Sequence, residues 1–60
     1  MEQNTVKEIF IELNERFEST ENLQALVTLL NYFEDFDFGF DEKDQSEIIS
    51  SITDSINILS

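Results

Sequence analysis

The sequence predicts a small all-α protein, a three-helix bundle in which a helical hairpin is followed by a third helix. Apolar residues recur at spacings of three and four over most of the 60 residues. The chain contains one glycine and no proline, so few residues interrupt this helical pattern. A single domain of this size buries only about 60% of the surface that its unfolded chain exposes. Because cysteine is absent, no disulfide can supplement the core. We therefore expect self-association, as a homodimer or a larger closed oligomer, to add stability.

The first helix is predicted over residues 5–18. Its apolar stripe consists of Val6, Ile9, Phe10, Leu13 and Phe17. Asn4 or Thr5 is placed to cap its N-terminus, because short polar side chains can accept a hydrogen bond from the first turn. Ile11 lies off the stripe and is therefore a candidate for a subunit contact.

The second helix is predicted over residues 21–35, with Thr20 as its N-cap, so that the short break predicts an antiparallel hairpin. One side carries Leu23, Leu26, Val27, Leu30 and Phe33. Ala25, Leu29 and Tyr32 widen the apolar arc beyond half the circumference, which is typical of a helix buried between two others. We therefore place this helix at the centre of the bundle and expect Leu29 and Tyr32 to leave apolar surface for a subunit contact.

Residues 36–41 alternate phenylalanine with aspartate around the only glycine, Gly39. The period of two is typical of a strand, but the segment is too short and too isolated to pair within this chain, so it is predicted to be a loop. Gly39 can adopt a positive φ there. Asp41, followed three residues later by Asp44, resembles a capping arrangement that opens a third helix.

The third helix is predicted over residues 42–58. Its apolar face consists of Ile48, Ile49, Ile52, Ile56 and Leu59. Ser51 and Ser55 flank this face and are small enough to let another helix approach closely. Since β-branched isoleucines are weak helix formers, this helix is expected to depend on tertiary packing.

The charge is the most unusual property of the composition. Fourteen acidic residues against three basic ones give a net charge of −11. Nucleic acids and anionic membranes are therefore excluded as direct partners, because both are bound by clustered lysine and arginine. A protein with a basic surface is the natural complement, and the alternative is that the acidity only keeps the protein soluble. The N-terminal residues lack the pattern of a signal peptide and no apolar run could span a bilayer, so we expect a soluble, cytoplasmic protein without a membrane partner.

Few kinds of catalytic or metal-binding chemistry fit this composition. Histidine, cysteine and a glycine-rich phosphate loop are all absent, so we expect neither an enzyme nor a cofactor. Asp35, Asp37 and Asp41 alternate as calcium ligands might. An EF-hand counted from Asp35 would, however, place Phe40 at the turn glycine and Ser46 at the bidentate glutamate. No metal site is therefore predicted.

The residues around the predicted loop combine phenylalanines with carboxylates and form the candidate partner-binding site. Its members are Glu34, Asp35, Phe36, Asp37, Phe38, Phe40, Asp41, Glu42 and Asp44. Apolar rings of this kind can enter pockets of a partner, while the acids pair with surrounding lysine or arginine. Alternatively, the rings close one end of the core. We expect this of one or two of them, because all three cannot easily point inward from an alternating segment.

Two functions fit these features. The first is capture and inhibition of a basic, nucleic-acid-binding protein by charge mimicry, as practised by small acidic inhibitors of phages and mobile elements. The second is an assembly module that associates through Ile11, Leu29 and Tyr32. Phenylalanines standing inside an acidic field would favour capture, whereas an apolar patch on the helices away from the acids would favour assembly.

Overall fold

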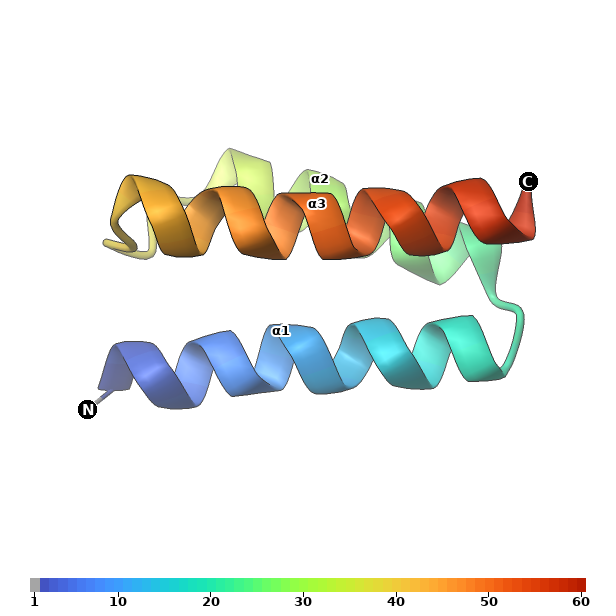
Figure 1. Ribbon diagram of the computed structural model, residues 1–60, viewed down its shortest axis with the longest axis horizontal. Coiled ribbons are helices and arrows are strands. Elements are labelled where there is room, and N and C mark those ends of the chain that lie inside the picture. The colour runs from blue at the N-terminus through green and yellow to red at the C-terminus, as the bar shows by residue number, and fades with distance from the viewer. Residues whose placement is uncertain (1) are drawn as a thin grey trace.

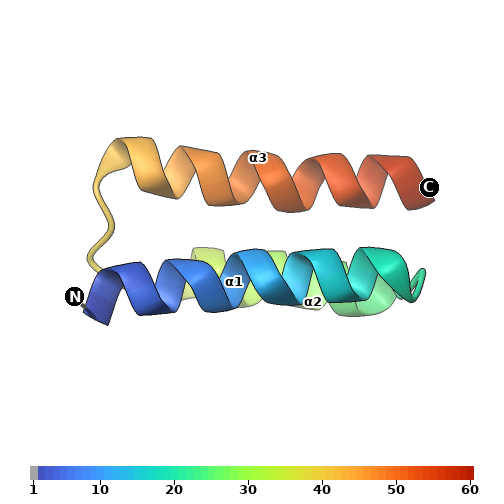
Figure 2. The same ribbon diagram turned by 60° about the horizontal axis from the view of Figure 1, so that its bottom comes forward.

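The computed structural model describes residues 2–60, with side chains from Thr5 onward, and it confirms the predicted all-α class. Three helices, α1 (Glu2–Ser19), α2 (Leu23–Asp35) and α3 (Glu42–Leu59), run antiparallel in succession, and the described chain contains no strand. The α1–α2 turn lies at one end of the bundle and the α2–α3 loop at the other (Figures 1 and 2). The body measures 31 × 17 × 16 Å.

Each helix packs against both of the others, so the prediction that α2 lies at the centre is wrong. The buried apolar core consists of Phe10, Leu26, Leu29, Phe33, Ile48 and Ile52. Both neighbours of α2 lie on the same side of it, so only an arc around Leu26 and Phe33 is buried. Val27, predicted on the buried side, is consequently exposed. Leu29 is only 7% exposed and belongs to the core of the single chain, so the prediction that it offers spare surface for a subunit contact is wrong.

The N-terminal part of α1 differs from the prediction in two ways. The helix begins at Glu2 and runs through Asn4 and Thr5, so neither residue is its N-cap; the side chain of Asn4 lies outside the described part. Ile9, predicted on the buried stripe, is 51% exposed, while Asn14 is only 6% exposed. The buried face of α1 is therefore shifted from Ile9 towards Asn14. The Oδ1 atom of Asn14 has no hydrogen-bond partner among the described residues.

The α1–α2 turn is closed by a Schellman arrangement. The backbone N–H of Asn22 donates to the carbonyl of Phe17 at 2.9 Å, and that of Glu21 donates to Glu18 at 3.0 Å. Glu21 occupies the left-handed position with φ 55°. Asn22 is the N-cap of α2 and accepts from Ala25 N at 3.1 Å. The predicted cap, Thr20, instead donates its hydroxyl to the last carbonyls of α1, so that prediction is wrong.

Helix α3 begins where the sequence predicted, at Glu42. Asp41 caps the helix by accepting from Asp44 N at 2.9 Å. Further along, Ser55 is buried, and its Oγ lies 3.1 Å from Oε1 of Glu18 in α1 and 3.2 Å from the carbonyl of Ser51. A small residue there lets α1 and α3 approach closely, as predicted. No helix in the described part of the chain is both long enough and apolar enough to cross a bilayer.

Candidate protein-binding site at the α2–α3 loop

Local hydrogen bonds and backbone angles shape the α2–α3 loop. Helix α2 ends where Phe36 becomes extended, with φ −117° and ψ 142°. The carboxylate of Asp37 then accepts from the backbone N–H of Gly39 at 2.9 Å, and Gly39 takes φ 80°, a value that favours glycine. Asp41 completes the segment by capping α3. Each local interaction restricts the loop backbone, and together they fix the direction of its side chains.

Phe38 and Phe40 close the loop end of the core. The Phe38 ring meets Phe10 edge-on at 5.2 Å between centroids and stacks on Phe33 at 5.8 Å with an interplanar angle of 12°. Phe40 lies 5.8 Å from Phe33. Aromatic pairs at these separations contribute beyond the burial of their area. Both rings are half-buried against the core, so the expectation that one or two of the loop rings point inward is confirmed.

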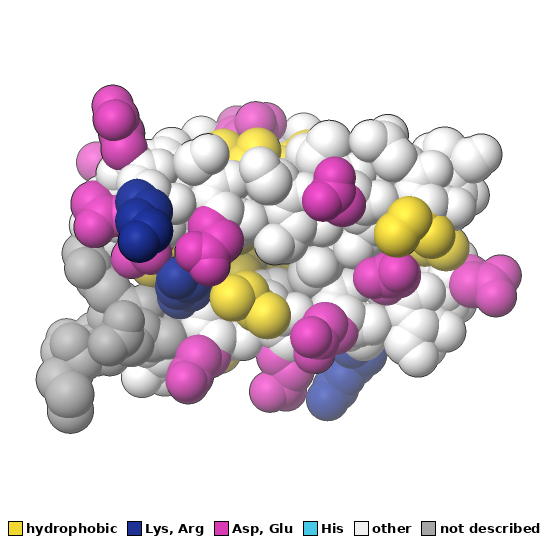
Figure 3. Space-filling view, viewed as in Figure 1, with side chains coloured by type: hydrophobic (Ala, Val, Ile, Leu, Met, Phe, Trp, Pro, Cys, Tyr) yellow, Lys and Arg dark blue, Asp and Glu magenta, His cyan; other side chains and the backbone are white. Residues whose placement is uncertain are grey.

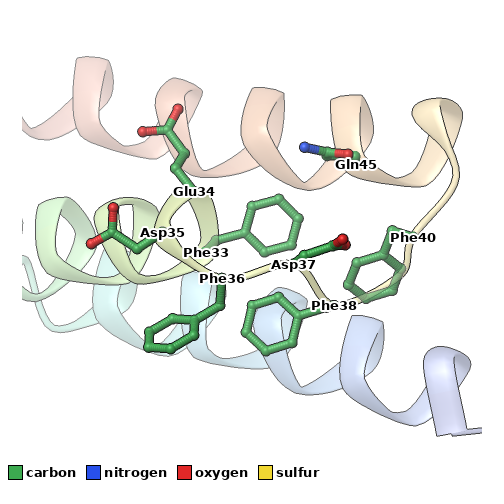
Figure 4. A pocket seen from close by; sticks show the side chains of 8 residues that line it. All are labelled: Phe33, Glu34, Asp35, Phe36, Asp37, Phe38, Phe40 and Gln45. Carbon is green, nitrogen blue, oxygen red and sulfur yellow. The ribbon is translucent and has the colours of Figure 1, made fainter.

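Phe36 is the ring that stays outside. It is 55% exposed, and its centroid lies 4.7 Å from that of Tyr32, which is itself 51% exposed. Figure 4 shows Phe36 on the opposite side of the loop from the core-facing Phe33. The exposed ring expected from the alternation is therefore Phe36.

An open pocket of about 370 Å³ lies beside this ring. It is lined by Phe33, Glu34, Asp35, Phe36, Asp37, Phe38, Phe40 and Gln45 (Figure 4). Most of its lining comes from the predicted site. Phe33 and Gln45 were not predicted, since Phe33 belongs to the apolar stripe of its helix and Gln45 carries no signal that separates it from any exposed helix residue.

The rim of the pocket is anionic. The side chains of Glu34, Asp35 and Asp37 are exposed, and none of them forms an ion pair with a side chain between residues 5 and 60. We call these three residues and Phe36 the acidic–aromatic site. A partner cation could reach these carboxylates without breaking an ion pair of that part of the chain.

The predicted residues in α3 and its cap have other roles. Asp44 forms an ion pair with Lys7 of α1, with Nζ 2.9 Å from Oδ1, and Lys7 also reaches Glu47 at 3.2 Å. These hydrogen bonds, the one to Asp44 first, raise the pKa of Lys7. Asp41 is the helix cap. Glu42 is exposed in the first turn of α3 but does not line the pocket.

Of the three residues predicted for subunit contact, Leu29 and Tyr32 line one shallow groove between α1 and α2, and Ile11 does not line it. Tyr32 is exposed beside Phe36, Leu29 is buried, and Ile11 is half-buried. Acidic side chains are spread along the face formed by α1 and α3, where hydrophobic side chains show only as small, separate areas (Figure 3). Negative charge therefore covers more of the molecule than the acidic–aromatic site alone.

No family model matches the chain, and comparisons with curated proteins and with solved structures found no match either.

Proposed function

We propose that this protein binds a basic surface of a nucleic-acid-binding protein and inhibits it by presenting carboxylates where the partner binds phosphates. The observation that carries the proposal is the exposed Phe36 ring, which lines one pocket together with three carboxylates that have no ion pair among the described side chains. A ring in an acidic field is the feature that separates capture of a basic partner from self-assembly.

The acidic–aromatic site offers two kinds of contact to such a partner. A phenyl ring beside carboxylates resembles a nucleobase beside phosphates, and proteins that bind single-stranded nucleic acid combine cationic grooves with surfaces that stack on bases. Arginine suits both parts, since its guanidinium pairs with carboxylates and stacks on aromatic faces. Phe36 would enter the partner's surface while Glu34, Asp35 and Asp37 pair with the cations around it.

The total charge supports the same proposal through the rate of encounter. A net charge of −11 on a body 31 Å long attracts a cationic partner from a distance, and such steering raises association rates by about 10- to 1,000-fold at low salt. Because steering is screened by ions, binding is expected to weaken between 50 and 200 mM salt.

Affinity capture from the source cell with two matched variants tests the proposal. The site variant Glu34→Gln/Asp35→Asn/Asp37→Asn removes three charges and keeps an oxygen at position 37 for the Gly39 N–H. The control variant Glu8→Gln/Glu15→Gln/Asp54→Asn removes three exposed charges elsewhere, so both have a net charge of −11 + 3 = −8. We expect the wild type and the control variant to capture the same protein. The site variant is expected to capture that protein about tenfold more slowly.

The captured protein is then assayed for binding to labelled duplex DNA and to RNA. The proposal predicts that added wild-type protein releases the nucleic acid and that the site variant does not. Equal capture by the two variants would show that only total charge matters. A captured protein that binds no nucleic acid would contradict inhibition by mimicry.

A further inference from the structure

A second surface, which we call the α1–α2 groove, runs between those two helices. It is lined by Leu13, Phe17, Ala25, Thr28, Leu29 and Tyr32 and holds about 330 Å³. Thr28 and Tyr32 supply the only polar side-chain groups of this lining, so the groove is almost wholly apolar. The core beneath it is closed by Leu29, which is buried.

The groove and the acidic–aromatic site share one residue. Tyr32 lines the groove and also packs its ring 4.7 Å from Phe36 and 6.0 Å from Phe38. Ile9, which precedes the groove residue Leu13 by one helical turn, is also exposed. An apolar strip therefore extends from the α1–α2 turn, beside Phe17 and Ala25, to the loop at Phe36.

The groove residues of α2 span about two turns of a helix. On α2, Ala25, Leu29 and Tyr32 stand at positions i, i+4 and i+7 and span about 10 Å along the axis. A bound amphipathic helix presents its anchors at the same spacings. Two turns of such a helix would place an apolar face of matching length into the groove.

The charges bordering the groove select a basic helix. Glu21 lies in the turn at one end and Asp35, three residues beyond Tyr32, at the other. On the α1 side, Arg16 follows Leu13 by three residues. Glu12 forms an ion pair with Arg16 at 3.7 Å, so the positive charge of Arg16 is balanced by the Glu12 carboxylate. The border is therefore net negative, and Glu34 and Asp37 add to it at the loop end.

We infer that the α1–α2 groove binds one amphipathic helix whose apolar face enters the groove and whose flanks carry lysine or arginine. The inference rests on the proposed function, because it specifies the part of the basic partner that is captured. A second copy of this chain fits poorly, since it would bring two molecules of charge −11 together and carry its own acidic border. A basic amphipathic helix would place apolar side chains in the groove and basic side chains beside its acidic border.

The test uses a synthetic peptide of about five helical turns, with leucines at i, i+3, i+4 and i+7 and lysines elsewhere. A scrambled peptide of the same composition has the same charge but no apolar face. Calorimetry at physiological salt is expected to give a Kd at least about tenfold lower for the patterned peptide. Equal affinities for the two peptides would overturn the inference and leave capture by charge intact.

Two arginine variants locate the binding surface. Thr28→Arg places a bulky cation in the wall of the groove, whereas Asn31→Arg adds the same charge at an exposed position of α2 that does not line it. We expect Thr28→Arg to weaken the patterned peptide about tenfold and Asn31→Arg to leave it within about twofold. If Thr28→Arg fails to fold by circular dichroism, Ala25→Arg replaces it, with the same expected loss.

The remaining outcomes separate the inference from the proposed function. Equal losses in the two arginine variants would overturn the groove as the binding surface. A dimer in sedimentation that Thr28→Arg converts to monomer would overturn it in favour of a second copy. In the partner-capture assay, loss of binding by Thr28→Arg but not by the site variant would support the groove and contradict the acidic–aromatic site.

Discussion

Phe36 and Phe38 stand two residues apart in an alternating segment and yet have opposite roles. An ideal alternation would place both rings on the same face, so the sequence indicates that not every ring of the loop can be buried but does not identify the exposed one. The turn through Gly39 and the end of α2 at Asp35 settle this by directing Phe38 towards Phe10 and Phe33. Phe36 instead contacts Tyr32 at the surface and stays exposed.

Alanine substitutions should separate these two roles. Phe38→Ala removes a half-buried ring from the core end and is expected to lower the free energy of unfolding by about 2 kcal/mol, below the roughly 3–5 kcal/mol of a fully buried phenylalanine. Phe36→Ala is expected to cost less than about 1 kcal/mol. Urea unfolding measures both. Similar losses would mean that Phe36 is part of the core and not a free anchor.

At the scale of the helices, local rules predicted some boundaries and failed at others. Helix α3 begins one residue after Asp41 as predicted, because its cap and its apolar period both act locally. The α1–α2 turn was misread because Thr20 and Asn22 are both good caps. The choice between them depends on Glu21 adopting a left-handed conformation. The sequence does not indicate this conformation, because the position is not occupied by glycine.

Replacing Glu21 tests this account of the turn. Glu21→Gly relieves the cost of a left-handed non-glycine residue and is expected to raise the free energy of unfolding by about 0.5–1 kcal/mol. Glu21→Gln removes the same charge but keeps the β-carbon, so it serves as the control. Thermal unfolding of both variants at one salt concentration decides the matter. An equal gain in the two would assign the effect to charge instead of backbone conformation.

Lys7 joins α1 to α3 and should make stability depend on alkaline pH. Its pKa is raised above 10.5 in the folded state, mainly by the hydrogen bond to Asp44, so the folded protein holds this proton more tightly than the unfolded chain. The resulting stabilisation is fully present below pH 10.5 and is lost as the pH rises through the folded pKa. The difference in Tm between wild type and Lys7→Met should therefore be constant below pH 10.5 and shrink as the pH rises above it. A difference that stays constant through this rise would show that the pair adds nothing through protonation.

At the scale of the whole molecule, charge and size act together. The Debye length is about 30 Å at 0.01 M salt and about 8 Å at 0.15 M. The first value equals the length of the body and the second is half its width, which is 17 × 16 Å. At low salt, therefore, every carboxylate interacts with every other one, whereas at physiological salt only neighbours do so.

Salt should consequently stabilise the fold. Raising the concentration from 0.01 to 0.15 M is expected to add about 1 kcal/mol, which corresponds to about 4–8 °C in Tm for a domain of this size. The site variant and the control variant, each with three fewer charges, should gain less. A Tm that does not change with salt concentration would indicate that each acidic side chain is stabilised by its own local contacts. That result would weaken the argument for a basic partner.

The arrangement of the helices explains what the sequence could not show about the surface. Helical periodicity shows which residues of a helix form its apolar arc, but it does not show which part of that arc the neighbouring helices cover. Leu29 was therefore assigned to the surface and Ile9 to the core. The groove is likewise formed by two helices and has no motif in either. Composition, by contrast, is independent of arrangement, which is why the acidic character of the candidate site could be predicted.

Tyr32 is the only tyrosine in a chain without tryptophan, so nearly all intrinsic fluorescence of the folded protein comes from one side chain. That side chain lies where the groove meets the acidic–aromatic site, and it is half exposed. A ligand on either surface would change the solvent around this one emitter. The molecule therefore carries its own optical probe at the junction of its two candidate binding surfaces, and occupancy can be followed without attaching a label.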